Sequence, residues 1–132
     1  MKITADTNVL IRAITGDEPR QSKVARAALA DAEIVALALP VLCELVWVLN
    51  QGYKIARPDI AETIRRLLNV ANVAVDRSAA EAGLAMLEAG GDFADGVIAY
   101  QGHWLGADTF VSFDRKAVKL MAALGQRSHL LT

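Results

Sequence analysis

Cysteine, net charge and long apolar segments are all scarce in this chain of 132 residues. The single cysteine, Cys43, excludes an intramolecular disulfide framework and a cysteine-based zinc site, and its apolar neighbours predict an inert core thiol. The net charge of −1 offers no broad basic field for a nucleic acid, although acids gathered in one pocket would mask a basic rim. The longest nearly apolar stretch, residues 34–49, contains Pro40 and Glu44 and is too short to cross a bilayer.

The N-terminal residues show no targeting signal, because they enter an apolar strand without a basic region or a signal segment. We therefore expect a soluble, cytoplasmic protein with no membrane partner. Apolar residues make up 54% of the chain and charged residues 22%, which is typical of a globular protein rather than a disordered one. No linker or internal repeat divides the chain, so we expect one domain over residues 1–132.

The hydrophobic pattern alternates short apolar strands with helices. Strands are expected at residues 2–5, 34–39, 73–75, 109–112 and around 129–131, and helices at 7–14, 20–31, 40–50, 58–68, 78–89, 92–105 and 115–124. Asp17 is expected to cap the second helix, and Ser78 with Glu81 has the form of a capping box. This order predicts an α/β protein, a three-layer α/β/α sandwich with a mostly parallel central sheet.

Four acidic residues stand where acids are out of keeping with their surroundings. They are Asp6 in ITADTNVLI, Glu44 in LPVLCELVWVL, Asp95 in GGDFADGVIAY and Asp114 in TFVSFDRKAV. Three of the four interrupt or end an apolar run, and carboxylates are almost never fully buried unless they are paired or bound. Asp6 and Asp114 follow predicted strands, whose carboxyl ends border the functional crevice of a parallel sheet. The topology therefore lets the four carboxylates approach one point.

Carboxylates gathered at one point would need a divalent cation, and their chemistry favours magnesium. Magnesium takes hard oxygen ligands and retains several waters. Neither His103 nor His129 has zinc-like spacing to an acid pair. In phosphodiester hydrolysis such a cation lowers the pKa of the attacking water and neutralises the scissile phosphate, with either one or two ions.

Each acid also has an ordinary structural interpretation when it is taken singly. Asp6, Asp92 and Asp114 all occupy positions where aspartate caps a helix. Glu44 would be explained by a buried arginine partner, although no basic residue lies within a helical turn of it. Asp92 and Asp95 stand three residues apart, on one face of a helix near its positive end. These alternatives stay open for each residue.

Taken in order, these segments resemble the PIN domain. DTN after the first strand, a lone Glu in an apolar helix, DFADGVIA and TFVSFDRK are similar to the family's motifs along essentially the whole chain. Within the family, the chain looks like the VapC-type toxin ribonucleases of toxin–antitoxin pairs. The resemblance implies a magnesium- or manganese-dependent endoribonuclease with Asp6, Glu44, Asp95 and Asp114 as its catalytic, metal-binding quartet. Ser112 departs mildly from the family, which often has Thr there, but it keeps the hydroxyl.

The resemblance also implies partners. These are an RNA substrate, a proteinaceous antitoxin that blocks the site, and commonly a second copy in a homodimer. Asn8, Asp92 and Ser112 are candidates for orienting the carboxylates or their water. Asn8 could equally satisfy backbone groups at the helix start, and Asp92 could bind the metal directly. Candidates for holding the RNA backbone are Arg12, Arg115 and Lys116.

Other functions remain open from the sequence. A PIN-like domain could act as a binding or scaffold module without nuclease activity, and the same metal chemistry would serve a DNA nuclease. A phosphoacceptor receiver domain has a similar length and an acidic magnesium pocket. It would need adjacent acids after the first strand and a lysine after the last, which this chain lacks. Trp47 is expected in the core or at a dimer interface.

Overall fold

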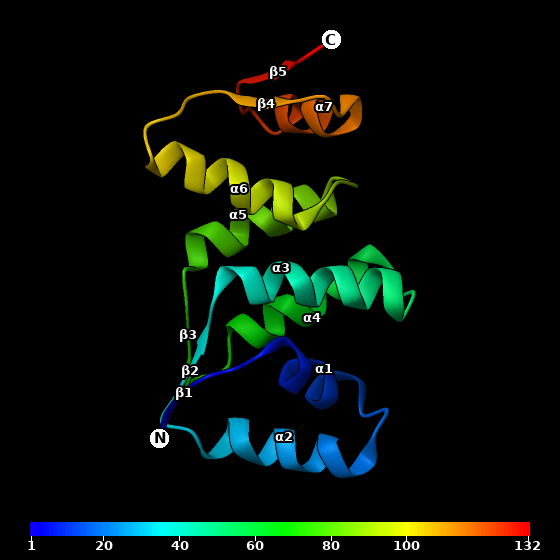
Figure 1. Ribbon diagram of the computed structural model, residues 1–132, viewed down its shortest axis with the longest axis vertical. Coiled ribbons are helices and arrows are strands. Elements are labelled where there is room, and N and C mark those ends of the chain that lie inside the picture. Colours follow the sequence, from blue (N-terminus) through cyan, green and yellow to red (C-terminus); the bar gives the residue numbers. More distant parts are fainter. The chain divides into compact units, whose positions relative to one another are not determined.

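The structure is a computed structural model that describes residues 1–132, and its chain divides into two compact units. Met1–Asp76 forms the N-terminal unit and Arg77–Thr132 forms the C-terminal unit. Each unit combines helices with parallel strands, which confirms the predicted α/β class (Figure 1). The strands belong to two sheets, one of three strands and one of two. A single domain over residues 1–132 stays a prediction.

The N-terminal unit is built on a parallel sheet with the strand order β1-β2-β3. Ile3 pairs with Val35, which pairs in turn with Val73. Parallel neighbours need long crossover connections, and helices supply them here. The elements are β1 (Lys2–Thr4), α1 (Thr7–Thr15), α2 (Pro19–Asp31), β2 (Ile34–Leu37), α3 (Leu39–Trp47), the π-helical η1 (Val48–Gly52), α4 (Arg57–Leu68) and β3 (Val73–Val75).

Branched aliphatic side chains from three helices form the core of this unit. Leu10 of α1, Leu42 and Leu45 of α3, and Ile60 and Ile64 of α4 are all at most 1% exposed. Burying each such side chain contributes about 1.5–3 kcal/mol relative to leaving it in water. This core holds α1 and α3 against each other at the positions that follow β1 and β2.

The C-terminal unit joins a helical pair to a small β-α-β segment. The helices α5 (Arg77–Glu88) and α6 (Phe93–Trp104) lie side by side, and α7 (Arg115–Ala123) connects the parallel strands β4 (Phe110–Ser112) and β5 (Ser128–Leu130) (Figure 1). Two glycines allow the helical pair to approach closely. A Cβ atom at Gly83 would lie 2.7 Å from the ring of Phe93, and one at Gly96 would overlap the carbonyl oxygen of Ala82.

Several local predictions need correction. Glu18, not Asp17, caps α2, and its two carboxylate oxygens accept the N–H groups of residues 20 and 21. The helix α5 begins at Arg77, so Ser78 lies within the first turn and does not open a capping box. Trp47 is 62% exposed, because the buried face of α3 is made by its leucines; this excludes the core, while a place at a dimer interface stays a prediction. Cys43, also expected in the core, is only partly buried.

None of the helices combines the length and the apolar character that a bilayer-spanning segment requires. The expected cytoplasmic location stays a prediction.

Candidate functional site

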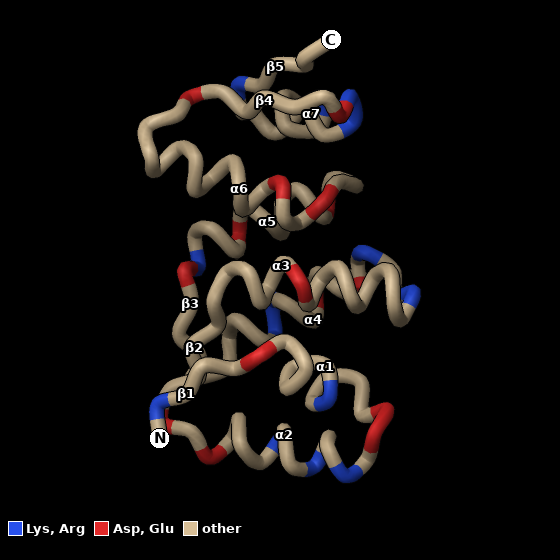
Figure 2. Tube along the Cα trace, in the orientation of Figure 1, with Lys and Arg blue, Asp and Glu red and all other residues tan.

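The C-terminal unit brings three of the predicted acids together. Asp92 is the N-cap of α6, where its Oδ1 accepts a first-turn N–H at 3.2 Å. Asp114 is the N-cap of α7, where its Oδ1 accepts two first-turn N–H groups at 3.0 and 3.2 Å. Asp95 lies one turn after Asp92, in the first turn of α6. Figure 2 shows these acidic positions at the starts of the two helices.

The three carboxylates interact electrostatically. Partial burial raises the pKa of Asp95 above its ordinary value of 3.8, and the negative charges of Asp92 and Asp114 raise this pKa further. Desolvation and like charges both penalise the ionised form, so the site favours either a proton on Asp95 or a cation beside it. A bound divalent cation would reverse the sign of this effect.

Two local features hold the acids in place. The Oγ of Ser112, at the end of β4, accepts the backbone N–H of Asp114 at 3.0 Å. The Ser112 hydroxyl, which was expected to act on the predicted ligands, therefore positions the backbone of Asp114. Gly96 follows Asp95 directly and lets α6 contact the backbone of α5. The position of Asp95 thus depends on a close approach of the two helices.

The other two predicted acids belong to the N-terminal unit. Asp6 follows β1 and caps α1, and its Oδ1 accepts the N–H of Thr7 at 2.7 Å. Glu44 lies on α3, the helix that follows β2. Because β1 and β2 are adjacent and parallel, Asp6 and the start of α3 stand at the same edge of the sheet. Glu44 is exposed and forms no ion pair, so a buried arginine partner is the wrong explanation for it.

The oxygen atoms left free distinguish these capping aspartates from acids with a purely structural role. Asp6, Asp92 and Asp114 each use only Oδ1 on the backbone, and each leaves Oδ2 without a hydrogen-bond partner. Asp17, in contrast, uses both oxygens, with Oδ1 bound to Arg12 and Thr15 and Oδ2 bound to Tyr53. The capping interpretation is therefore confirmed, and it leaves each carboxylate able to bind a cation.

These donor atoms are hard carboxylate oxygens, which suit magnesium or manganese. No group of three or more His, Cys, Asp or Glu side chains is arranged to hold a metal ion by itself. The chemistry of the donors thus fits a divalent cation.

The candidates for contacting RNA differ in their surroundings. Arg12 is engaged at the α1–α2 junction, where its guanidinium lies 3.2 Å from the carboxylate of Asp17 and 2.7 Å from the amide oxygen of Gln21. Arg115 and Lys116 are exposed in the first turn of α7, beside Asp114. Arg12 therefore has a structural task, while Arg115 and Lys116 are exposed and contact with RNA stays a prediction for both.

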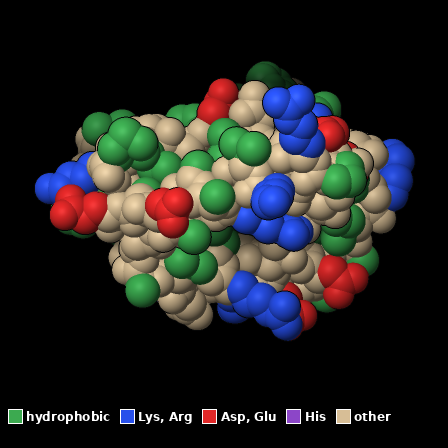
Figure 3. Space-filling view, turned by 90° about the horizontal axis from the view of Figure 1, so that it is seen from below, with side chains coloured by type: hydrophobic (Ala, Val, Ile, Leu, Met, Phe, Trp, Pro, Cys, Tyr) green, Lys and Arg blue, Asp and Glu red, His purple; other side chains and the backbone are tan.

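The face of the N-terminal unit formed by α2 carries Lys and Arg side chains among apolar ones (Figure 3). Arg20, Lys23 and Arg26 of α2 are exposed, and Arg26 donates a hydrogen bond to the carbonyl of Ala13 at 2.8 Å. A chain with a net charge of −1 thus has a local basic surface, which overall charge could not reveal. Asn8 lies beside it, in the groove between α1 and α2.

Sequence reasoning gave Asp92 more than one role and missed one cavity. Asp92 was expected as a helix cap, with a role around the metal or bound to it as the alternative; it is the cap of α6, and its charge also acts on Asp95. Its spacing of three residues from Asp95 was the available signal. A cavity in the C-terminal unit, at the other end of α6, has no sequence motif that would have indicated it.

The fold and this site define an α/β protein with carboxylates after parallel strands and at helix starts. The sequence profile of the PIN domain matches residues 3–122. The chain therefore belongs to the PIN domain family, whose members are generally nucleases that usually use divalent metals. A comparison with curated proteins found no significant match.

Proposed function

We propose that the protein is a magnesium- or manganese-dependent endoribonuclease and the toxin of a type II toxin–antitoxin pair. Membership of the PIN family supports the nuclease chemistry. The observation that carries the proposal is the cluster of Asp92, Asp95 and Asp114, in which burial and like charges raise the pKa of Asp95. A divalent cation would relieve this repulsion, and the cluster would need further ligands to hold one, since its three acids do not form a metal site by themselves.

In this proposal Asp6, Glu44, Asp95 and Asp114 act together as the metal ligands. The order of the family's motifs along the chain supports their joint action, and each of the four has a carboxylate oxygen that the protein leaves free. Asp92 completes the negative field around Asp95. The site would thus favour hard cations that prefer oxygen ligands.

The bound cation would supply a lower pKa for the attacking water and would neutralise charge on the scissile phosphate. The chain's own residues have the tasks of positioning. The first-turn N–H groups of α7 fix Oδ1 of Asp114, and Ser112 fixes its backbone, which gives the free Oδ2 a defined direction. Arg115 and Lys116 place positive charge beside Asp114, where the RNA backbone would approach.

The decisive experiment is cleavage of total cellular RNA by the purified full chain, with manganese or magnesium compared with EDTA. Asp95→Asn should lower the cleavage rate about a hundredfold or more, because it removes a charge needed to hold the cation. Asp59→Asn is the matched control, since Asp59 also lies in the first turn of a helix, α4, and is exposed. This control should stay within about twofold of the wild type, as expected for a surface position.

Metal-dependent cleavage that Asp59→Asn retains and Asp95→Asn loses would support the proposal. The contrary result concerns protein that has been denatured to remove any bound partner and then refolded. It is the absence of cleavage by this folded protein with either metal. That result would overturn the nuclease assignment and favour a PIN domain that acts as a binding module.

The toxin role requires a protein partner, and exposed apolar side chains support one. Trp104 and Leu105, at the end of α6, are 74% and 89% exposed, and Phe113 is 76% exposed directly before Asp114. Adjacent exposed apolar side chains, such as Trp104 and Leu105, mark protein contacts. An antitoxin that presents an arginine would suit the carboxylates, because a guanidinium fork binds them with two hydrogen bonds. A homodimer would use similar apolar contacts.

Expression in a bacterial host tests the toxin role separately from the chemistry. The wild type and Asp59→Asn should arrest growth within the cytoplasm, and Asp95→Asn should not. Arrest by all three variants would show that toxicity does not depend on the acidic site. Normal growth with an RNA-cleaving wild type would overturn the toxin role alone.

A further inference from the structure

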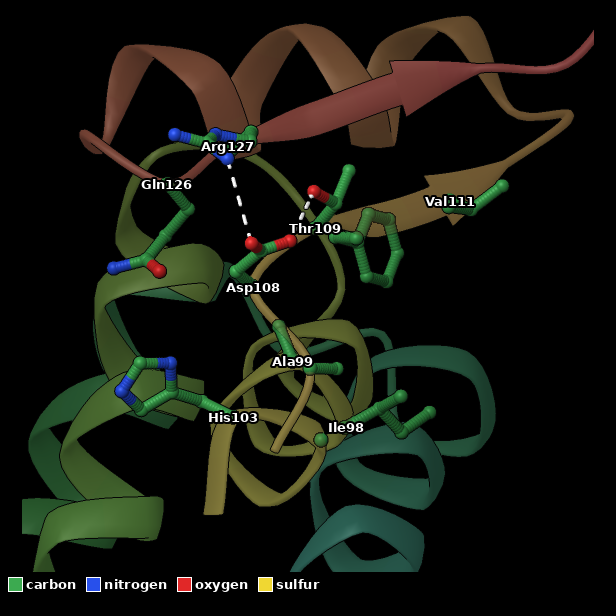
Figure 4. A pocket seen from close by; sticks show the side chains of 11 residues that line it. Ile98, Ala99, His103, Asp108, Thr109, Val111, Gln126 and Arg127 are labelled. Atoms are coloured by element: carbon green, nitrogen blue, oxygen red, sulfur yellow. Dashed lines mark hydrogen bonds and ion pairs between the residues drawn. The ribbon is translucent and has the colours of Figure 1, made fainter. Parts of the chain in front are cut away.

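A cavity of about 220 Å³ lies in the C-terminal unit, at the end of α6 away from the acids (Figure 4). The last turns of α6, the start of β4 and the segment that enters β5 form its walls. Figure 4 shows His103 and Gln126 on one side of it and Ile98 and Val111 on the other. The cavity thus has a polar wall and an apolar wall, and it lies outside the proposed metal site.

An ion pair neutralises the charges of the cavity. Oδ2 of Asp108 lies 3.4 Å from Nη1 of Arg127, and Oδ1 accepts the hydroxyl hydrogen of Thr109 at 2.7 Å. The hydrogen bond from Thr109 and then the charge of Arg127 lower the pKa of Asp108 below 3.8, so the pair stays ionised at neutral pH. The side-chain amide of Gln126 makes no hydrogen bond to the protein, and it offers both a donor and an acceptor.

This chemistry excludes several classes of ligand. A phosphate group would favour a site with net positive charge, and here the carboxylate of Asp108 offsets the charge of Arg127. A metal ion would need several protein ligands, and the cavity offers only Asp108 and His103, with no third His, Cys, Asp or Glu grouped with them. A whole cofactor is too large, because pockets for such ligands measure about 300–1,000 Å³. A small, neutral, flat ring with hydrogen-bonding edges and apolar faces remains.

We propose that this cavity binds one unpaired nucleobase of the RNA, an inference about the substrate that rests on the proposed function. Proteins hold single-stranded bases by contacts to their faces and by hydrogen bonds to their edges, and glutamine pairs with two groups on the edge of adenine. His103 follows Asp95 on the same helix by about 12 Å, from the rise of 1.5 Å per residue. One strand can therefore reach the acids and the cavity together.

The test is nucleotide binding by the ¹⁵N-labelled full chain in EDTA, where no metal-dependent cleavage takes place. The probes are AMP, GMP, CMP and UMP, with ribose 5-phosphate as the ligand that lacks a base. At least one nucleotide should shift the side-chain amide signal of Gln126 and bind about tenfold more tightly than ribose 5-phosphate. Gln126→Ala should remove about tenfold of this affinity. Gln101→Ala, an exposed glutamine of α6 outside the cavity, is the matched control and should not change it.

Two results would overturn the proposal: equal affinity for the nucleotides and ribose 5-phosphate, or unchanged nucleotide affinity in Gln126→Ala. Neither depends on whether the protein cleaves RNA. Base binding by a chain that does not cleave would leave the cavity assignment standing and overturn the proposed function. Cleavage by a chain that binds no base would overturn the cavity assignment and leave the proposed function standing.

Discussion

Acids lie at helix starts in two parts of the molecule. In one part the protein supplies partners for the negative charge, and in the other it does not. At the α1–α2 junction, Asp17 receives hydrogen bonds from Tyr53 at 2.6 Å and from Thr15 at 2.8 Å, and its ion pair with Arg12 measures 3.2 Å. These contacts lower the pKa of Asp17, with the Tyr53 hydrogen bond as the largest cause. The charge is neutralised, and it ties α1, the turn before α2 and the segment after η1 together.

At the starts of α6 and α7 no cation approaches the acids closely enough to form an ion pair. Asp92 and Asp114 are close enough to Asp95 to raise its pKa. Natural proteins rarely leave like charges together without a use for them, because the repulsion destabilises the folded state. The comparison teaches that an acid with all its partners is part of the framework, while acids that repel one another mark a site for a ligand.

The largest expected effect is the increase in the free energy of unfolding when manganese binds to the acids. Bound only by the folded state, it should stabilise the wild type by about 2.7 kcal/mol when present at roughly a hundred times its Kd. Asp95→Asn should lose most of this gain, because one of the repelling charges is gone. Asp17→Asn should keep it, since that acid is already satisfied within the protein. Urea unfolding with manganese and with EDTA measures both, and identical manganese effects in the two variants would break the comparison.

The second effect concerns how Asp95 is held in place. Gly96→Ala should destabilise the fold by about 2 kcal/mol, because the new methyl group meets the rigid backbone carbonyl of Ala82. Gly102→Ala is the matched control in the same helix, where a Cβ meets no atom within 4 Å. That change should stabilise the protein by about 0.5–1 kcal/mol through helix propensity. Urea unfolding in EDTA measures both, and the same sign for both variants would contradict the packing argument.

The smallest effect is the dependence of stability on pH, and its sign differs between the two places. The raised pKa of Asp95 means that the folded state binds its proton more tightly, so this residue costs stability as the pH rises above 3.8. The lowered pKa of Asp17 means that its contribution is present above 3.8 and is lost as the pH falls through the folded-state pKa. In EDTA at pH 7, Asp95→Asn should therefore be more stable than the wild type, and Asp17→Asn less stable.

The Asp95 difference should shrink toward zero as the pH falls below 3.8, and the Asp17 difference only as the pH falls below the lowered folded-state pKa of that residue. Each difference disappears once its carboxyl group is protonated in the folded and unfolded states alike. Denaturation by urea across a pH series in EDTA measures them. A stability difference that keeps its size at low pH would show that the substitution acts through packing rather than charge.

Much of the local structure was predictable because it depends on near neighbours. The α/β class follows from alternating strands and helices, and Asp6, Asp92 and Asp114 cap helices through N–H groups within three residues. The helix boundary at Arg77 was missed because a sequence signal at Ser78 resembled a cap. Boundaries of this kind depend on how a whole helix packs, which a local motif does not record.

Burial was less predictable than secondary structure. Glu44 and Trp47 stand in an apolar segment, yet both are exposed, because Leu42 and Leu45 occupy the buried face of α3. The helix is apolar nearly all round, so its sequence alone does not choose the face. Packing against α1 makes that choice.

The sequence by itself determined the class of the fold, the caps and the identities of the acids, since hydrophobic period and short-range hydrogen bonds depend on adjacent residues. Tertiary structure decided which groups lie near the acids and therefore how their pKa values shift. Tyr53 reaches Asp17 across 36 positions of chain, and Asp114 acts on Asp95 from another helix. Coulomb energy depends on distance in space and on burial, and the path of the folded chain sets both.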